Sequence, residues 1–479
     1  MATDPFARLD ATAQAELVRR RDVAPHEPIE AAIARIERLN PTLNAVIHLA
    51  LEQARDRART SRTGGPFAGV PTLMKDIGGV EAGMPCHAGM QALKTAGWRE
   101  SVDAYFTRKA TDAGLVSLGR TNTPELALLP TTEPDAYGAT RNPWNLQHSA
   151  GGSSGGAAAA VAAGLVPVAH ASDGGGSIRG PASMCGLVGL KPTRGRCSFG
   201  PTIGERWSGF SCEFFVSRTV RDTAALLDAV AGAMPGDPYA APPPTAPWLS
   251  ALAAPGKLRI GCMRTTPRSG ALHAENLAAV ERTAKALSAL GHTVEESHPP
   301  ALDEEQSVNA YVTVVASSVA RALEAAAAKV GRPLAAEDVE PLTWALAEHG
   351  RGVSAVTLLA TIEYVHAYGR RLADWWESGF DLLLTATQAQ PPPELGYLTS
   401  TRDDPFRAFL RAAPFGTCTL PWNLSGQPAI SVPTHITPEG LPVGVQLIAP
   451  YAREDLLLAV AAQLEQSLPW HTRLPPVHA

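Results

Sequence analysis

Two clusters of glycine and serine lie close together in the middle of the chain. Residues 151–156 read GGSSGG and residues 174–177 read GGGS, and Ser177 follows Ser153 at a spacing of 24 residues. Glycine loses more conformational freedom on folding than other residues, so two such clusters indicate a backbone that must closely approach a ligand. Serine supplies a nucleophilic hydroxyl, and N–H groups without side chains suit a developing oxyanion. The segment predicts acyl-transfer chemistry, although two flexible loops around a buried helix would have the same composition.

A lysine at the end of an apolar run supplies a candidate base. Residues 65–80 read GPFAGVPTLMKDIGGV, and Lys75 closes the apolar part of this run. Burying an ammonium group is costly, and burial lowers the pKa of lysine. A neutral Lys75 would accept the proton of the nucleophile through Ser153, as in serine–lysine variants of the triad. Taken alone, a lysine at such a position is more often a surface residue.

Other uses of glycine clusters fit these residues less well. The P-loop pattern needs a lysine after its last glycine, which GGSSGG lacks, and the dinucleotide pattern GxGxxG occurs at neither cluster. The α/β-hydrolase pattern GxSxG matches residues 151–155 and 152–156, but it must follow a core strand, and the preceding RNPWNLQHSA does not read as one. The histidines are scattered, without HExxH or paired Cys/His spacing. We therefore expect neither a metal nor a cofactor.

Composition and charge narrow the class of protein. Of 479 residues, 45% are hydrophobic and 18% are charged, which is typical of a globular protein with a sizeable core. The net charge of −5, without basic blocks, argues against nucleic acid or an anionic membrane as a partner. Six cysteines occur without CxxC pairs, and no secretory signal or membrane-spanning run of about 20 apolar residues is evident. We expect a cytoplasmic protein with a small-molecule substrate and without a nucleic acid or membrane partner, for which a homodimer is one assembly to consider.

Strand and helix patterns alternate along the chain. Apolar runs predict strands at 70–75, 166–172, 257–263, 380–387 and on both sides of the Glu439-Gly440 turn. Helical spacing predicts a capped helix from Asp10 to Arg21, a helix ended by Pro41, and helices over 43–60, 157–166, 214–232, 275–291 and 453–468. A helical stretch is also predicted over 305–378, interrupted by Gly331 and Pro333. Strands interspersed with helices predict an α/β sheet covered on both faces.

We expect one domain over residues 1–479, with five parts. Peripheral helices occupy 1–60, and the segment with the chemical motifs occupies 61–235. The proline-rich residues 236–256 form a connection, 257–405 form a more variable helical part, and 406–479 return to the sheet and end in a helix.

A set of motifs resembles the amidase signature family. GVPTLMKD, GRTNTPE, RNPWN, GGSSGG, SDGGGSIRGPA, GLKPT and NLSGQPAIS occur in that order across nearly the whole chain. The resemblance implies a single α/β/α domain around a mixed sheet and the hydrolysis of amides by a Ser–cis-Ser–Lys triad through an acyl-enzyme. By motif, Ser177 would be the nucleophile, Ser153 the bridging serine on a cis peptide, and Lys75 the base.

The resemblance also implies supporting and substrate-binding residues. The oxyanion hole would be the backbone of Gly174, Gly175, Gly176 and Ser177. Ser154 would support the triad by hydrogen bonding, and Asp173 and Arg179 would brace the glycine loop. The expected pocket residues are Thr131, Thr132, Tyr137, Ile203, Trp207, Cys418 and Trp422, of which the aromatic ones would suit the core equally well.

Within the family, segments such as ATAQAELV, SGQPAIS and REDLLL are similar to bacterial members that cleave nylon oligomers and to urethanase-like amidases. The expected substrate is therefore a hydrophobic or aryl amide, a carbamate or a nylon-type oligomer. A glutaminase subunit of an amidotransferase is one alternative within the family. A non-catalytic binding protein on the same fold is an alternative of another class.

Overall fold

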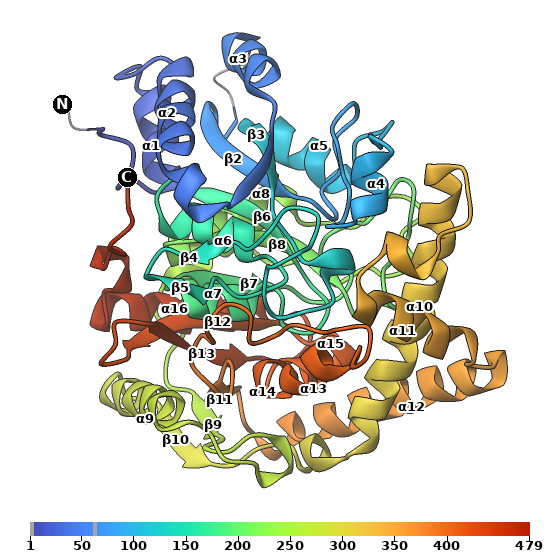
Figure 1. Ribbon diagram of the computed structural model, residues 1–479. Helices are drawn as coiled ribbons and strands as arrows, with labels where there is room; N and C mark the ends of the chain where they lie inside the picture. The colour runs from blue at the N-terminus through green and yellow to red at the C-terminus, as the bar shows by residue number, and fades with distance from the viewer. Residues whose placement is uncertain (1–3, 61–64) are drawn as a thin grey trace.

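An eight-stranded mixed sheet forms the centre of the protein (Figure 1). The computed structural model describes residues 4–60 and 65–479. The strand order is β10-β9-β11-β13-β12-β7-β8-β6; β9 is parallel to β10 and to β11, and the other neighbours are antiparallel. The strands are β6 (Val168–Asp173), β7 (Val188–Lys191), β8 (Cys212–Ser217), β9 (Arg259–Cys262), β10 (Thr293–Glu296), β11 (Leu382–Ala386), β12 (Ala429–Ile436) and β13 (Pro442–Ile448).

Helices cover both faces of this sheet. The helices α6 (Gly155–Ala162) and α7 (Arg179–Cys185) pack against one face, and α8 (Val220–Val230), α9 (Ala274–Ala289) and α16 (Glu454–Ser467) pack against the other. Every residue of α6 is buried, and its sequence GGAAAAVA keeps it narrow enough to lie close to its neighbours. The predicted α/β/α architecture around a mixed sheet is confirmed.

A separate three-stranded sheet brings Lys75 to the edge of the large one. It has the order β1-β3-β2, formed by β1 (Val46–Leu49), β2 (Val70–Lys75) and β3 (Leu115–Thr121). Every residue of β2 is buried. The Thr72 hydroxyl donates to the Val168 carbonyl at 3.0 Å, which joins β2 to β6. As a result, the last residue of β2 faces the end of β6, where the second glycine cluster begins.

The N-terminal helices, blue in Figure 1, lie beside the three-stranded sheet. They are α1 (Ala11–Arg19), which is capped by the Asp10 carboxylate, α2 (His26–Leu43) and α3 (Leu51–Thr60). The prediction of one helix over 43–60 was wrong, because Val46–Leu49 pairs with β3 as a strand. The prediction that Pro41 ends its helix was also wrong, because α2 continues to Leu43.

Three long helices form the other flank of the molecule, yellow to orange in Figure 1: α10 (Gln306–Val330), α11 (Pro341–Arg351) and α12 (Ala355–Asp374). By length and composition α10 would be able to cross a membrane, but it packs against α11 and α12 within the fold. Its buried residues repeat at helical spacing, as in Val315, Val319 and Leu323.

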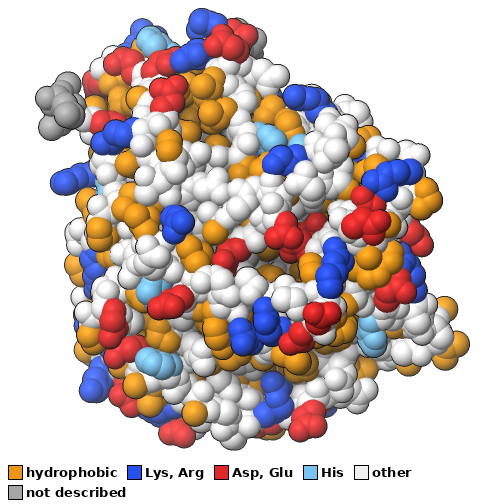
Figure 2. All heavy atoms as spheres, viewed as in Figure 1, with side chains coloured by type: hydrophobic (Ala, Val, Ile, Leu, Met, Phe, Trp, Pro, Cys, Tyr) orange, Lys and Arg blue, Asp and Glu red, His pale blue; other side chains and the backbone are white. Residues whose placement is uncertain are grey.

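On the face of the protein drawn in Figure 2, basic and acidic side chains are interspersed, and neither charge forms a large patch of its own.

The prediction of a helix over 214–232 is corrected by the structure. Residues 212–217 form β8 between β6 and β7, and the helix α8 begins only at Val220, where Thr219 caps it. The aromatic and β-branched residues Phe214, Phe215 and Val216 favour a buried strand, and the helical pattern that follows them obscured this preference.

The small two-stranded sheet formed by β4 (Arg141–Asn142) and β5 (Asn145–Ser149), which precedes the first glycine cluster, lies outside the large sheet.

Candidate active site

The Lys75 ammonium nitrogen lies among three serine hydroxyls. Its Nζ is 2.7 Å from Ser153 Oγ, 2.9 Å from Ser154 Oγ and 3.0 Å from Ser172 Oγ. The strand β2 supplies the lysine, the first glycine cluster supplies Ser153 and Ser154, and β6 supplies Ser172. Lys75, Ser153 and Ser154 are fully buried. The predicted base and bridging serine are therefore in direct contact.

Burial makes the Lys75 ammonium group a stronger acid, which loses its proton more readily than an exposed lysine does. The pKa of Lys75 is lowered from 10.5 to about 7, chiefly by removal from water and also by the charge of Arg206, whereas Asp173 and Glu213 oppose the shift. A lysine with a pKa near 7 is substantially neutral at neutral pH and can accept a proton.

The first glycine cluster holds Ser153 in place by backbone contacts. The Gly152–Ser153 peptide bond is cis. A side chain on Gly152 would lie 2.4 Å from the Thr131 nitrogen and 2.5 Å from the Leu129 oxygen, so only glycine fits there. The Thr123 hydroxyl donates to the Ser153 carbonyl at 2.9 Å.

The second glycine cluster wraps around the carboxylate of Asp173. Its Oδ1 accepts the Gly176 N–H at 2.7 Å, and its Oδ2 accepts the Ile178 N–H at 3.1 Å. The Arg179 guanidinium donates to both oxygens, at 2.9 and 3.0 Å, and the pair is fully buried. This pairing with Arg179 holds the pKa of Asp173 well below its usual value despite burial. Asp173 and Arg179 thus hold the loop together.

Three N–H groups of this loop are free to bind a ligand. Within the described part of the chain, the N–H groups of Gly174, Gly175 and Ser177 have no backbone or side-chain acceptor. Gly176, which the resemblance included in the oxyanion hole, differs, because its N–H is already donated to Asp173. The loop can therefore present at most three of the four expected donors to a carbonyl oxygen that becomes negative.

Each glycine of this loop lies against a large or polar side chain. A Cβ on Gly174 would be 2.7 Å from the Trp207 ring, and one on Gly175 would be 2.5 Å from the Tyr311 hydroxyl. Gly176 has a φ of +134° and would meet Thr419 Oγ1 at 2.4 Å. Thr419 Oγ1 also donates to the Gly175 carbonyl at 2.6 Å, which fixes the orientation of the neighbouring peptide.

This packing predicts a rescue between two substitutions. We expect Gly175→Ala to lower kcat by about 10- to 100-fold, because the methyl group displaces the loop from Tyr311 and misplaces the donors. Removing the hydroxyl in Gly175→Ala/Tyr311→Phe leaves the nearest ring carbon at 3.2 Å and should restore much of kcat. Equal kcat values for the single and double variants would contradict the packing argument, and Tyr311→Phe alone serves as the control.

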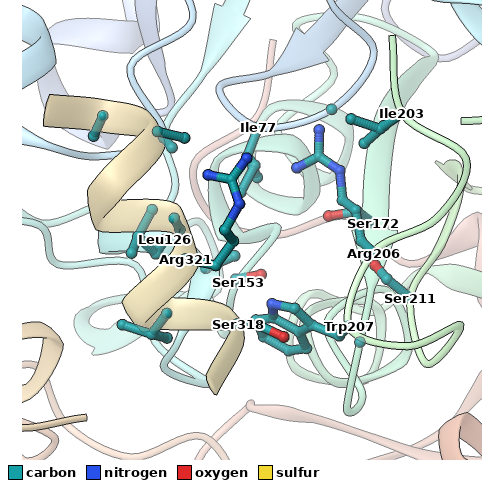
Figure 3. Close-up of a pocket in the computed structure, with 18 of the residues that line it drawn as sticks. Ile77, Leu126, Ser153, Ser172, Ile203, Arg206, Trp207, Ser211, Ser318 and Arg321 are labelled. Carbon is teal, nitrogen blue, oxygen red and sulfur yellow. The ribbon is translucent and has the colours of Figure 1, made fainter. Parts of the chain in front are cut away.

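Ser177 stands between two cavities. The larger, of about 630 Å³, is lined by Ser153, Ser172, Gly174 and Ser177, by residues 203–208 and by α10 (Figure 3). The smaller, of about 200 Å³, is lined by Gly175, Gly176 and Ser177, by residues 127–130 and by the first turns of α10. Trp207 lines both cavities. A substrate bond at Ser177 would thus have one portion in each cavity.

The expected pocket residues divide into two groups. Ile203 and Trp207 line the larger cavity. The other five line neither cavity. Thr132 accepts the Gly155 N–H, and the Tyr137 hydroxyl forms hydrogen bonds with His87 and His48. The remaining three are buried: Thr131, Cys418 and Trp422. Apart from Tyr137, these residues support the first glycine cluster or fill the core, where polar partners and apolar neighbours inside the protein surround them.

Thr419, which directly precedes the short helix α15 (Leu420–Ser425), and Asn423 within this helix contact the glycine loop and were not among the predicted site residues. Cys418 and Trp422 point into the core, whereas Thr419 and Asn423, each one position later, face the glycine loop. Asn423 Nδ2 donates to Asp173 Oδ1 at 2.9 Å, and its Oδ1 accepts from Arg179 at 2.7 Å. The four-residue spacing of Thr419 and Asn423 was the available signal for a shared helical face.

Behind Lys75 lies a second buried pair, His170 and Glu213. The Lys75 N–H donates to His170 Nδ1 at 3.3 Å, and His170 Nε2 lies 3.7 Å from Glu213. Burial lowers the pKa of His170, so the ring is neutral.

Across residues 4–60 and 65–479, no group of three or more His, Cys, Asp or Glu side chains is arranged to hold a metal ion.

Known proteins resemble this chain over nearly its full length. A family model described as Amidase matches residues 27–458. The 6-aminohexanoate-cyclic-dimer hydrolase of Pseudomonas sp. (strain NK87) is 44% identical over 475 residues, which cover 97% of this chain and 96% of the relative.

Solved structures agree with this finding. The structure of a 6-aminohexanoate cyclic dimer hydrolase complexed with substrate superposes with a TM-score of 0.96 at 43% identity, covering 99% of this chain and all of the other. A bacterial aryl acylamidase of the amidase signature family gives a TM-score of 0.87 at 30% identity and covers 97% of each chain.

Proposed function

The chain belongs to the amidase signature family, and from that premise we propose that it hydrolyses a hydrophobic or aryl amide, a carbamate or a nylon-type oligomer through Ser177, Ser153 and Lys75. Membership of the family makes the protein an amidohydrolase that acts on carbon–nitrogen bonds other than peptide bonds. The substrate and the roles of the three residues are the proposal.

The proposed reaction begins with proton transfer from Ser177 through Ser153 to neutral Lys75. Ser177 Oγ attacks the carbonyl carbon, and the oxyanion accepts hydrogen bonds from the free N–H groups of the glycine loop. The proton returns through Ser153 to the leaving nitrogen, the C–N bond breaks, and an acyl-enzyme on Ser177 remains. Water then attacks this ester with the same base, which releases the acid and restores Ser177.

The observation that carries the proposal is the environment of Lys75. Its Nζ lies 2.7 Å from Ser153 Oγ, the lysine side chain is fully buried, and burial lowers the pKa of Lys75 to about 7. A structural lysine would gain by pairing with a carboxylate, whereas the partners of Nζ among the described residues are all hydroxyl groups. Such a lysine is poised to accept a proton at neutral pH.

The substrate class rests on the relatives and on the cavity walls. One relative is named for the 6-aminohexanoate cyclic dimer and another for aryl acylamides. The smaller cavity is lined mainly by apolar groups, among them Leu128, Leu129, Phe409 and Phe415. An apolar lining suits a hydrophobic or aromatic acyl group.

A substrate panel tests this proposal. We expect turnover of p-nitroanilides of aromatic or medium-chain acids, and turnover of at least one carbamate or short nylon oligomer, measured by release of the amine. Release of ammonia from glutamine, with no hydrolysis of the panel, would instead support the glutaminase alternative. Binding of panel members without any hydrolysis would support the non-catalytic alternative.

A further inference from the structure

Two arginines point into the larger cavity, and among the described residues neither forms an ion pair with a carboxylate. Figure 3 shows Arg321 entering from α10 and Arg206 from the facing segment, with both guanidinium groups directed into the same space. Arg206 Nε is buried and has no hydrogen-bond partner, although its guanidinium lies 5.9 Å from the centre of the Phe199 ring. In the described residues, neither arginine forms an ion pair.

The carboxylates near these arginines are engaged elsewhere. Glu100 pairs with Lys329 at 3.0 Å and accepts from Trp98 Nε1 at 3.1 Å. Burial raises the pKa of Glu205, and the Gly209 N–H and the charge of Arg194 oppose this shift, so its carboxylate interacts with those two groups.

Glu213 is buried, lies 3.7 Å from His170 and accepts the Gly79 N–H at 3.4 Å. His170 and, more weakly, the charge of Arg206 lower the pKa of Glu213 against the effect of burial, but Arg206 and Glu213 form no ion pair among the described residues. Two guanidinium charges in one partly enclosed space repel each other, and an anion bound between them would remove that repulsion.

The portion of the substrate that occupies this cavity follows from the proton path. The proton must pass from Ser153 to the leaving nitrogen, so that nitrogen lies on the side of Ser153. Ser153 and Ser172 line the larger cavity, whereas the smaller one has the backbone of Gly175 and Gly176. The amine portion therefore belongs in the larger cavity, and the acyl portion in the smaller, more apolar one.

We propose that the preferred substrates are amides whose amine portion ends in a carboxylate, that is, N-acyl derivatives of amino acids, with Arg206 and Arg321 binding this carboxylate. The inference rests on the proposed function of Ser177. Planar guanidinium groups bind carboxylates in a bidentate manner, which would orient the amine portion along the cavity. In the reaction, the acyl–nitrogen bond breaks, one water supplies a hydroxyl to the acyl group and a proton to the nitrogen, and a carboxylic acid and a free amino acid leave.

Matched pairs of substrates test the proposal. One member is an N-benzoyl derivative of a straight-chain ω-amino acid, and the other is the corresponding amino alcohol, in which a neutral hydroxymethyl group replaces the carboxylate. For the chain length that best spans the cavity, we expect kcat/KM to favour the acid about 10- to 100-fold, the range of a charge-assisted hydrogen-bonded pair. The preference should lie mainly in KM, because the carboxylate is remote from the reacting carbonyl.

Substitutions identify the groups responsible. Arg206→Gln and Arg321→Gln should each reduce the preference about tenfold, and the double variant should bring the ratio of the two kcat/KM values close to one. Arg321→Glu should transfer the preference to N-benzoyl diamines, whose terminal ammonium pairs with the new carboxylate. Arg282→Gln, on the exposed surface of α9, removes the same charge far from the cavity and should leave the ratio as in the wild type.

Calorimetric binding to Ser177→Ala separates this inference from the proposed function. If the acids bind more tightly than the alcohols and Arg206→Gln removes the difference, the carboxylate site stands even if no substrate is hydrolysed. Equal affinities of acid and alcohol would overturn the inference while leaving the hydrolysis of both in place. A preference for the reversed series, with the carboxylate on the acyl portion of an anilide, would also overturn it.

Discussion

We expect Ser177→Ala to abolish turnover, with kcat falling by about 10⁴- to 10⁶-fold. The change removes the protein atom that forms a covalent bond to the acyl group in the proposed reaction, while the glycine loop and Lys75 remain. The measurement is amine release under single-turnover conditions. In the wild type, intact-protein mass spectrometry during turnover of a p-nitroanilide should find the acyl mass, and peptide mapping should place it on Ser177.

The matched control is Ser318→Ala, which removes another serine hydroxyl from the wall of the same cavity. Its kcat should stay within a few-fold of the wild type, because Ser318 lies on α10 and has no part in the proton path. An acyl group found on Ser153 or Ser154, or an active Ser177→Ala enzyme, would show that another serine is the nucleophile.

Lys75→Met should lower kcat by about 10²- to 10⁴-fold, the usual range for removal of a general base. In the wild type, kcat/KM should rise with pH through about 7, because only the neutral amine accepts the proton and the pKa of Lys75 is about 7. The Lys75→Met variant should lose this rise. A matched control is Lys191→Met, which removes a second buried lysine, whose Nζ donates to the Pro192 carbonyl.

The buried Lys75 should also make the stability of the protein depend on pH, with the wild type losing stability as the pH falls from about 10.5 to 7. The folded protein holds Lys75 with a pKa near 7 against 10.5 when unfolded, so the unfolded chain binds more protons between these values. The unfolding free energy of Lys75→Met relative to the wild type should therefore increase by a few kcal/mol as the pH falls from about 10.5 to 7. Denaturant titrations at several pH values measure this change, and a pH-independent difference would mean that Lys75 keeps its charge on folding.

The sequence predicts the parts of the site that depend on local pattern. Lys75 ends an apolar run, and a buried strand follows directly from that run. The serines beside two glycine clusters indicate acyl transfer, and the Asp10 cap and the alanine-rich helix α6 also follow from local residues. In these cases the side chain and its neighbours in the chain settle the conformation.

The sequence does not predict contacts that depend on distant segments. The Gly176 N–H donates to the Asp173 carboxylate because Arg179 and Asn423 orient that carboxylate. Asn423 lies 250 positions from Asp173 in the sequence. The pair of Arg206 and Arg321 comes from a turn and a helix whose distance no local pattern reveals. Helical spacing shows which side chains share a face of α10, but not that this face borders a cavity.

The helix α10 lines both cavities with one continuous face, at steps of three and four residues from Ser307 through Tyr311 and Val314 to Arg321. No atom of this helix takes part in the proposed proton path, and the helix belongs to the connection between β10 and β11. In the proposed reaction, the residues of the proton path and the cavity-lining face of α10 therefore come from different stretches of the chain. A laboratory-evolution library confined to this face of α10 would sample new substrates without touching Lys75, Ser153 or Ser177.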